Sequence, residues 1–145
     1  NGIEFIVKEG WEPRIPPDFK NSLGETITDS LLRLDVPLLI HVSKDLETMP
    51  LTWQEDFNAL GYAANFRGWK MVALTNVEQN LAGPFAEEHS IPYPFLTCDQ
   101  TELKIIIRSN PGLVLLQHGV VLGKWAGRDV PTPAEMSEFI LKGEY

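Results

Sequence analysis

Cysteine is nearly absent from this chain of 145 residues, which carries a single one, Cys98. One cysteine excludes an internal disulfide framework, a dithiol redox pair and a cysteine-rich zinc site. Basic residues are also scarce, since 12 lysines and arginines stand against 20 acidic residues, for a formal net charge of −8. Nucleic-acid binding requires clustered cations that meet phosphates, so this balance argues against a nucleic-acid partner.

Long apolar runs are missing as well. The longest, around Val36–Ile40 and Leu113–Leu116, fall far short of the ~20 residues that a membrane-spanning helix needs, so we expect no membrane insertion by these residues. No phosphate-binding glycine loop, nucleophile elbow or zinc-ligand spacing is present, and no cofactor is predicted. The chain begins at Asn1 and has no signal-peptide pattern, from which we expect a processed product or a piece of a longer protein.

The chain divides into a proline-rich start and a region of alternating strands and helices. Residues 1–35 predict an irregular N-terminal arm that packs on the domain, with a short helix around 28–34. Residues 36–145 are predicted to form the one domain. Apolar runs of strand length predict buried strands over 36–43, 69–75, 112–117 and 120–126.

Helix signals lie between these strands. The T-x-x-E spacing of Thr52 and Glu55 is typical of a capping box and predicts a helix that ends near Gly68. A second helix is expected over 76–89, with a break or restart at Gly83–Pro84.

Later signals complete the pattern. Asp99–Glu102 has capping-box spacing and predicts a short helix through Ile107. His118 and Gly119 are typical of a tight hairpin between the last two strands. Thr132, Pro133 and Glu135 combine a cap, a proline suited to the first helical position and a capping-box glutamate, so the last helix begins there.

These elements predict a three-layer α/β sandwich, whose central mixed sheet combines a parallel pair with an antiparallel hairpin. Residues 107–127 (IRSNPGLVLLQHGVVLGKWAG) resemble the second half of thioredoxin-like domains. In that family a proline, usually cis, precedes two strands joined by a glycine turn and followed by a closing glycine. Pro111, Gly119 and Gly127 match those three positions, and 36–76 resembles the first strand, helix and second strand. The resemblance implies a thioredoxin-like fold for residues 36–142.

A narrower resemblance concerns the location. The Asp45-Leu-Glu47 loop, LKIIIRSNPG (103–112) and Gly123-Lys-Trp125 are similar to soluble thioredoxin-like modules at the C-terminus of DoxX-type membrane proteins of Bacteroidetes-type bacteria. This resemblance implies a place in the cell envelope, at the periplasmic face of the inner membrane. The chain would then be the soluble portion of a larger, membrane-anchored protein.

One departure from the family decides the predicted function. Thioredoxin-like enzymes carry C-x-x-C, or at least one cysteine, just after the first central strand, where the following helix lowers the thiol pKa. The corresponding residues here, Ser43–Pro50, contain no cysteine, so dithiol–disulfide exchange is not possible. The sequence therefore predicts a non-catalytic binding module.

The predicted binding groove lies where the family docks extended peptides. Its partner would be a protein or peptide segment, the chain's own membrane domain included, held by strand-like main-chain pairing. The structural alternative is that Pro111 serves only the turn geometry. The candidate groove residues are Lys44, Asp45, Glu47, Asn110 and Pro111.

Three other interpretations remain open. Cys98 would serve a monothiol oxidoreductase or a peroxide-reactive enzyme, or it is a small buried hydrophobe. Asp45 and Glu47 would hold a hard cation or act as acid and base, or they are solvated loop residues. His41, inside an apolar run, is either a hydrogen-bonded core residue or a pH sensor.

Overall fold

A six-stranded mixed sheet forms the centre of the computed structural model, which describes residues 6–7, 19–21, 23, 25–44, 52–99 and 110–142. The strand order is β1-β6-β5-β2-β3-β4. β2, β3 and β4 are parallel, β5 is antiparallel to both β2 and β6, and β1 is parallel to β6. The strands are β1 (Ile6–Val7), β2 (Leu38–Ser43), β3 (Lys70–Thr75), β4 (Phe95–Thr97), β5 (Gly112–Gln117) and β6 (Val120–Ala126).

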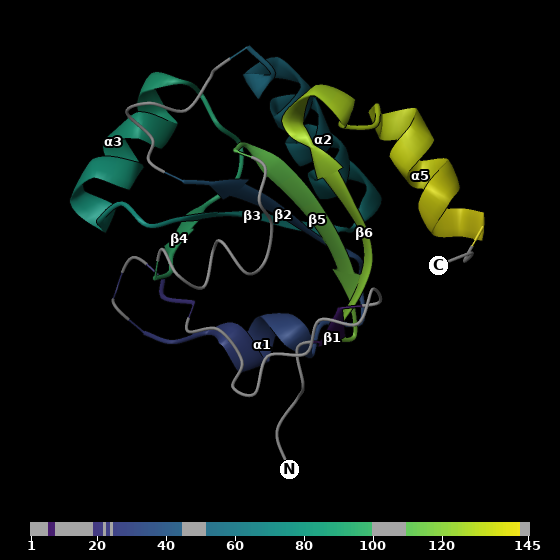
Figure 1. Cartoon of the computed structure of the whole chain (residues 1–145), viewed down its shortest axis with the longest axis horizontal. Coiled ribbons are helices and arrows are strands. Elements are labelled where there is room, and N and C mark those ends of the chain that lie inside the picture. The colour runs from purple at the N-terminus through teal and green to yellow at the C-terminus, as the bar shows by residue number, and fades with distance from the viewer. Residues whose placement is uncertain are drawn as a thin grey trace.

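Helices cover both faces of this sheet. The short helix α1 (Thr28–Leu32) lies on one face, and α2 (Gln54–Arg67), α3 (Gln79–Glu88) and α5 (Pro133–Lys142) lie on the other (Figure 1). A 3-10 turn, η1 (Gly127–Asp129), connects β6 to the last helix. This is the predicted three-layer α/β sandwich. Within the described ranges, no helix combines the length and apolar character needed to cross a membrane.

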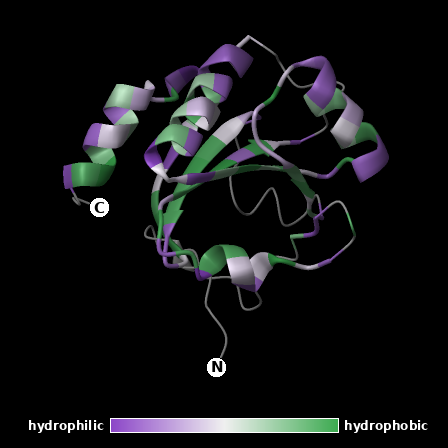
Figure 2. Cartoon of the chain, turned by 180° about the vertical axis from the view of Figure 1, so that it is seen from behind, coloured by the Kyte–Doolittle hydropathy of each residue, from purple (hydrophilic) through white to green (hydrophobic). Residues whose placement is uncertain are grey.

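Strand β2 is almost continuously apolar because both of its faces are buried. Leu38, Ile40 and Val42 belong to the core cluster on the α1 face, whereas Leu39 belongs to the cluster on the α2 face. All six residues of β2 are buried, as its apolar run predicted. The strands accordingly form the most hydrophobic layer of the chain in Figure 2.

Part of the N-terminal region contributes to the same core. Phe19, Leu31 and Leu32 are almost fully buried in the α1-face cluster. The Thr28 hydroxyl accepts a hydrogen bond from the Phe19 main-chain N–H (2.8 Å), which ties this segment to the start of α1.

Two local signals from the sequence are confirmed. The last helix has a reciprocal capping box, because Thr132 N–H donates to Glu135 Oε1 (2.9 Å) and Glu135 N–H donates to Thr132 Oγ1 (3.2 Å). The hairpin turn places His118 at φ 55° and Gly119 at φ 78°, the two positive values that a tight hairpin requires.

The predicted start of the helix after β2 was wrong. Thr52 and Glu55 form no capping box: α2 begins at Gln54, and its N-cap, Trp53, makes no side-chain capping bond. The ring of Trp53 packs against the α2-face core, so burial of this ring outweighs the exposed Thr52 cap in setting where the helix begins.

The break predicted at Gly83–Pro84 was also wrong, because helix α3 continues through Pro84. Proline removes one hydrogen bond from a helix, and its ring disfavours helical geometry in the residue before it by contact with that residue's Cβ. The preceding residue is Gly83, which has no Cβ, so the second of these penalties is reduced. The short helix expected over 99–107 lies outside the described residues from position 100 onward.

Candidate functional site

The end of β2 and the residues before β5 form the first part of the site. The antiparallel register pairs Val42 with Gly112, and two residues beyond this pair Lys44 is bonded to Asn110. The Asn110 side chain makes two hydrogen bonds there: Oδ1 accepts from Lys44 N–H (2.9 Å) and Nδ2 donates to the Lys44 carbonyl (2.7 Å). A side-chain amide thus bonds both main-chain groups of Lys44 at the end of the ladder.

Pro111 is enclosed by two residues distant in sequence. The Asn110–Pro111 bond is cis, and the Pro111 carbonyl accepts a hydrogen bond from Gly127 N–H (3.0 Å). A Cβ on Gly127 would lie 2.9 Å from Pro111 Cγ and 3.1 Å from Trp53 Cε3. Glycine is therefore the residue that permits this close approach of the start of η1 to Pro111 and Trp53.

We refer to Lys44, Asn110 and Pro111 as the Lys44–Asn110 site. The structure brings these three predicted residues together. Asp45 and Glu47, the other two candidates, lie outside the described residues, so their part in the site stays a prediction. Trp53 was not among the residues predicted for the site, although its ring also lies close to Gly127.

A buried polar network lies beside this site, on the α2 face of the sheet. His41 Nδ1 is 2.6 Å from the Tyr93 hydroxyl oxygen, and His41 Nε2 is 2.9 Å from Ser43 Oγ. Gln54 Nε2 donates to the Tyr93 oxygen (3.3 Å). The His41 ring stacks on Phe57, with centroids 3.8 Å apart and planes 13° from parallel. The network therefore joins β2, the first turns of α2 and the loop before β4.

Both ring nitrogens of His41 have a hydroxyl partner. When the Tyr93 hydroxyl donates to Nδ1 while its oxygen accepts from Gln54, the ring hydrogen is on Nε2 and is donated to Ser43 Oγ. Burial lowers the pKa of His41 to about 3 and raises the pKa of Tyr93 above its usual value, so both side chains are neutral at pH 7.

This arrangement does not activate Ser43. A serine nucleophile needs a basic histidine and access for its substrate, whereas burial lowers the pKa of His41 to about 3 and Ser43 is itself completely buried. The interpretation of His41 as a hydrogen-bonded core residue is confirmed. Its ring is completely buried, and no buried side-chain nitrogen or oxygen of the described residues lacks a hydrogen-bond partner.

Cys98 lies two strands away from the Lys44–Asn110 site. It follows β4, and its main-chain N–H donates to the Thr75 carbonyl (2.9 Å). The residue is 7% exposed and belongs to the core cluster on the α1 face, together with Phe19 and Leu96. A thiol nucleophile must be reached by its substrate, so this environment favours the structural interpretation of Cys98.

We expect Cys98 to react with a thiol reagent such as DTNB roughly 100-fold or more slowly in the native chain than in the chain unfolded by guanidinium, because the reagent must wait for local opening. Stopped-flow absorbance with the two samples measures this ratio. Native labelling at the rate of the unfolded chain would contradict the burial and support the monothiol alternative.

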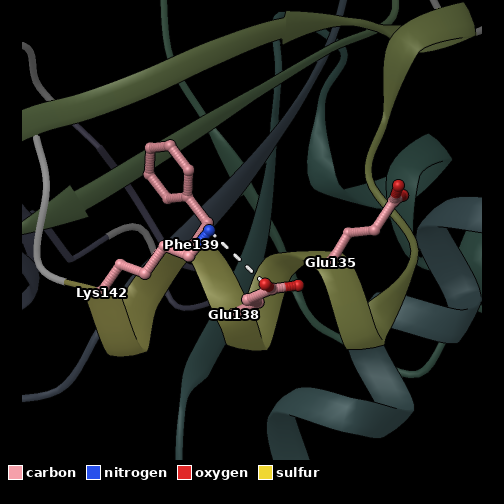
Figure 3. Close-up of a pocket in the computed structure, with 4 residues that line it drawn as sticks. All are labelled: Glu135, Glu138, Phe139 and Lys142. Atoms are coloured by element: carbon pink, nitrogen blue, oxygen red, sulfur yellow. Dashed lines mark ion pairs between the residues drawn. The ribbon is translucent and has the colours of Figure 1, made fainter.

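A hollow of about 270 Å³ on the surface of α5 is separate from this site. Its lining within the described residues comes from that one helix (Figure 3), and Lys142 pairs with Glu138 one turn away (3.4 Å). These two side chains are 59% and 68% exposed, so we assign the hollow no function. Within the described ranges, no three His, Cys, Asp or Glu side chains lie together as metal ligands would.

Comparisons with known proteins give similarity at the level of structure alone. No protein-family model matches the sequence, and no curated protein matches it. Among solved structures, StoA from Bacillus subtilis has a TM-score of 0.63 at 18% identity, over 88% of this chain and 99% of that one. An uncharacterized thioredoxin-like protein from Porphyromonas gingivalis has a TM-score of 0.65 at 18% identity, over 90% and 94% of the two chains.

A thiol:disulfide interchange protein from Chlorobium tepidum is similar in the same way, with a TM-score of 0.61 at 13% identity over 91% of this chain and 98% of that one. Identities this low show the fold and leave the activity open. The order of strands, the helices on both faces and the cis-proline before β5 agree with that fold. The chain therefore has a thioredoxin-like fold, in which the single cysteine lies away from the end of β2.

Proposed function

We propose that the chain is a thioredoxin-like domain without thiol catalysis, which binds an extended protein segment at the Lys44–Asn110 site. Residues 43–50 contain no cysteine, and Cys98 is buried in the core on the α1 face. Neither position therefore supports the thiol chemistry that the family performs at the end of its first central strand. Binding is the activity that the remaining residues support best.

The observation that carries this proposal is the pair of hydrogen bonds between the Asn110 side chain and the Lys44 main chain. They hold Asn110 against the end of β2 in one arrangement. A surface ordered before binding loses less conformational entropy when its partner arrives. The Lys44 main-chain groups are already bonded, so an extended segment bound there would pair with the main chain of Asn110, and its side-chain contacts would give specificity.

Peptide selection followed by NMR tests this function. Peptides from a random displayed library would be selected on the native chain, and one of them titrated into ¹⁵N-labelled protein. We expect saturable shift changes at the amides of Ser43, Lys44 and Gly112. Asn110→Ala should weaken the affinity about tenfold, because it removes both bonds that order the site.

Gln117→Ala is the matched control. Gln117 lies at the other end of β5, and its side-chain amide also bonds a main-chain carbonyl, that of Asp35 (3.1 Å). Its loss should leave the peptide affinity unchanged. Shift changes gathered elsewhere, equal losses in the two variants, or turnover of a disulfide substrate by the native chain would each contradict the proposal.

We also propose that this domain is the extramembrane part of an envelope protein, on the periplasmic side of the inner membrane. The support is the resemblance of residues 45–47, 103–112 and 123–125 to modules of DoxX-type membrane proteins. Several spans of about 20 apolar residues elsewhere in the same gene product would support this location. A gene product without such spans would contradict it.

A further inference from the structure

A second hollow, of about 310 Å³, lies at the outer edge of the sheet, where β4 is the last strand. It is lined from the α1 side by Ile27 and Leu31, from the sheet by Val72 and Leu96, and from α3 by Gly83. It shares no residue with the Lys44–Asn110 site. The volume lies near the lower end of the range for small-molecule sites in proteins.

The main chain of β4 is already bonded along this edge. The Phe95 carbonyl accepts a hydrogen bond from Gln79 Nε2 (2.9 Å). Thr97 exchanges two main-chain hydrogen bonds with Lys20, at 2.8 and 2.9 Å. An added peptide strand would have to displace these bonds, so an occupant that uses side-chain contacts fits the hollow better than an extended peptide does.

The lining combines apolar walls with one charged group. Ile27, Leu31, Val72 and Leu96 present aliphatic surface. Among the described lining residues, which also include the polar Asn21 and Gln79, Lys70 is the only charged one, and it is exposed. Its ammonium group makes no ion pair with any residue in the described ranges. On a chain of net charge −8, an unpaired cation beside an aliphatic hollow is complementary to a ligand with an apolar body and one negative charge.

Gly83 keeps the α3 wall of this hollow open. Apart from its chain neighbours, a Cβ added there would meet no atom within 4 Å, so the hollow beside α3 is open at this point. The same glycine also relieves contact with the ring of Pro84 inside the helix.

We propose that this hollow binds a monocarboxylate with an aliphatic tail of medium length, a fatty acid by chemical class. The carboxylate pairs with the Lys70 ammonium, and the tail lies between Leu31, Leu96 and the α3 wall at Gly83. The small volume excludes long acyl chains from full burial. This site is independent of the segment-binding function proposed above.

Titration of decanoate, below its micelle concentration, into the ¹⁵N-labelled chain tests the proposal. We expect saturable shift changes at the amides of Leu31, Gly83 and Leu96. Lys70→Gln should weaken binding about tenfold, because the charge-assisted bond to the carboxylate is lost. Gly83→Leu should abolish saturable binding by filling the hollow, whereas Gly83→Ala, which places the same Cβ beside Pro84, should retain most of the affinity. Circular dichroism checks that both variants keep the helix content of the native chain.

Two controls separate this site from general adsorption of a detergent-like probe. Lys142→Gln removes a cation of α5 and should leave decanoate binding unchanged. Decyltrimethylammonium has a tail of the same length and the opposite charge, and should bind more weakly than decanoate. The proposal is overturned by shifts that do not saturate, by equal affinity for the two probes, or by unchanged binding in both Lys70→Gln and Gly83→Leu.

Discussion

Lowering the pH from 7 to 4 is expected to remove about 3 kcal/mol of stability through His41 alone. Burial lowers the pKa of this side chain from 6.5 to about 3 in the folded chain. The unfolded chain therefore binds one more proton than the folded chain between these two values. The stability that depends on a neutral His41 is present above pH 6.5. It is lost as the pH falls toward 3, by about 1.4 kcal/mol per pH unit.

Urea unfolding at a series of pH values measures this slope. His41→Asn removes the titrating group while keeping a neutral polar side chain, so its stability should fall less steeply between pH 6.5 and 4. Carboxylates titrate in both chains, and their contribution therefore cancels in the comparison. NMR of the His41 imidazole gives an independent check: a ring that titrates near pH 6.5 in the folded chain would refute the expected slope.

At alkaline pH the same network has the opposite dependence. Burial raises the pKa of Tyr93 in the folded chain, so the unfolded chain ionises first as the pH rises above 10. Stability is then lost with rising pH. The stable range of the domain is thus limited at both ends by residues in hydrogen-bond contact with each other.

Replacing Phe57 by alanine is expected to destabilise the chain by about 3–5 kcal/mol, the usual loss for a large aromatic ring removed from a core. Phe57 is completely buried and covers the face of the His41 ring at 3.8 Å. Its loss leaves a cavity and also opens the neutral imidazole to water. The midpoint and slope of a urea unfolding curve, followed by circular dichroism, measure the change.

Phe66 offers a matched comparison in the same helix. It is 90% exposed, so Phe66→Ala should change the free energy of unfolding by less than about 0.5 kcal/mol. Both variants lose the same atoms and gain the same helix propensity. A similar loss in the two variants would mean that α2 packs on the sheet through a different face than described.

Local patterns in the sequence predicted the fold where one short segment contains the whole interaction. The capping box of Thr132 and Glu135 spans four residues, and the turn at His118 depends on its own main-chain angles. The equally regular spacing of Thr52 and Glu55 predicted a capping box that α2 does not have. A competing contact, the burial of Trp53 against the core, involves residues that the local pattern does not contain.

Less of the site than of the fold could be predicted from the sequence, because its hydrogen bonds join residues that are distant in the chain. The bond from His41 to Tyr93 joins residues 52 positions apart, and the bonds from Lys44 to Asn110 join residues 66 positions apart. The resemblance around Pro111 indicated where the site lies. It gave no sign that the Asn110 side chain would bond the main chain of Lys44, and the proline-flanked Tyr93 gave no sign that its hydroxyl would bond His41.

The bonds that Gln79 and Lys20 make to β4 bear on how copies of the domain behave in concentrated solution. A sheet edge with unpaired main-chain groups is a template on which another molecule can add a strand and begin an aggregate. At this edge the outward carbonyl of Phe95 and both outward groups of Thr97 are already occupied. Neighbouring molecules therefore meet side chains rather than an open ladder at β4, which limits growth of intermolecular sheets from this side.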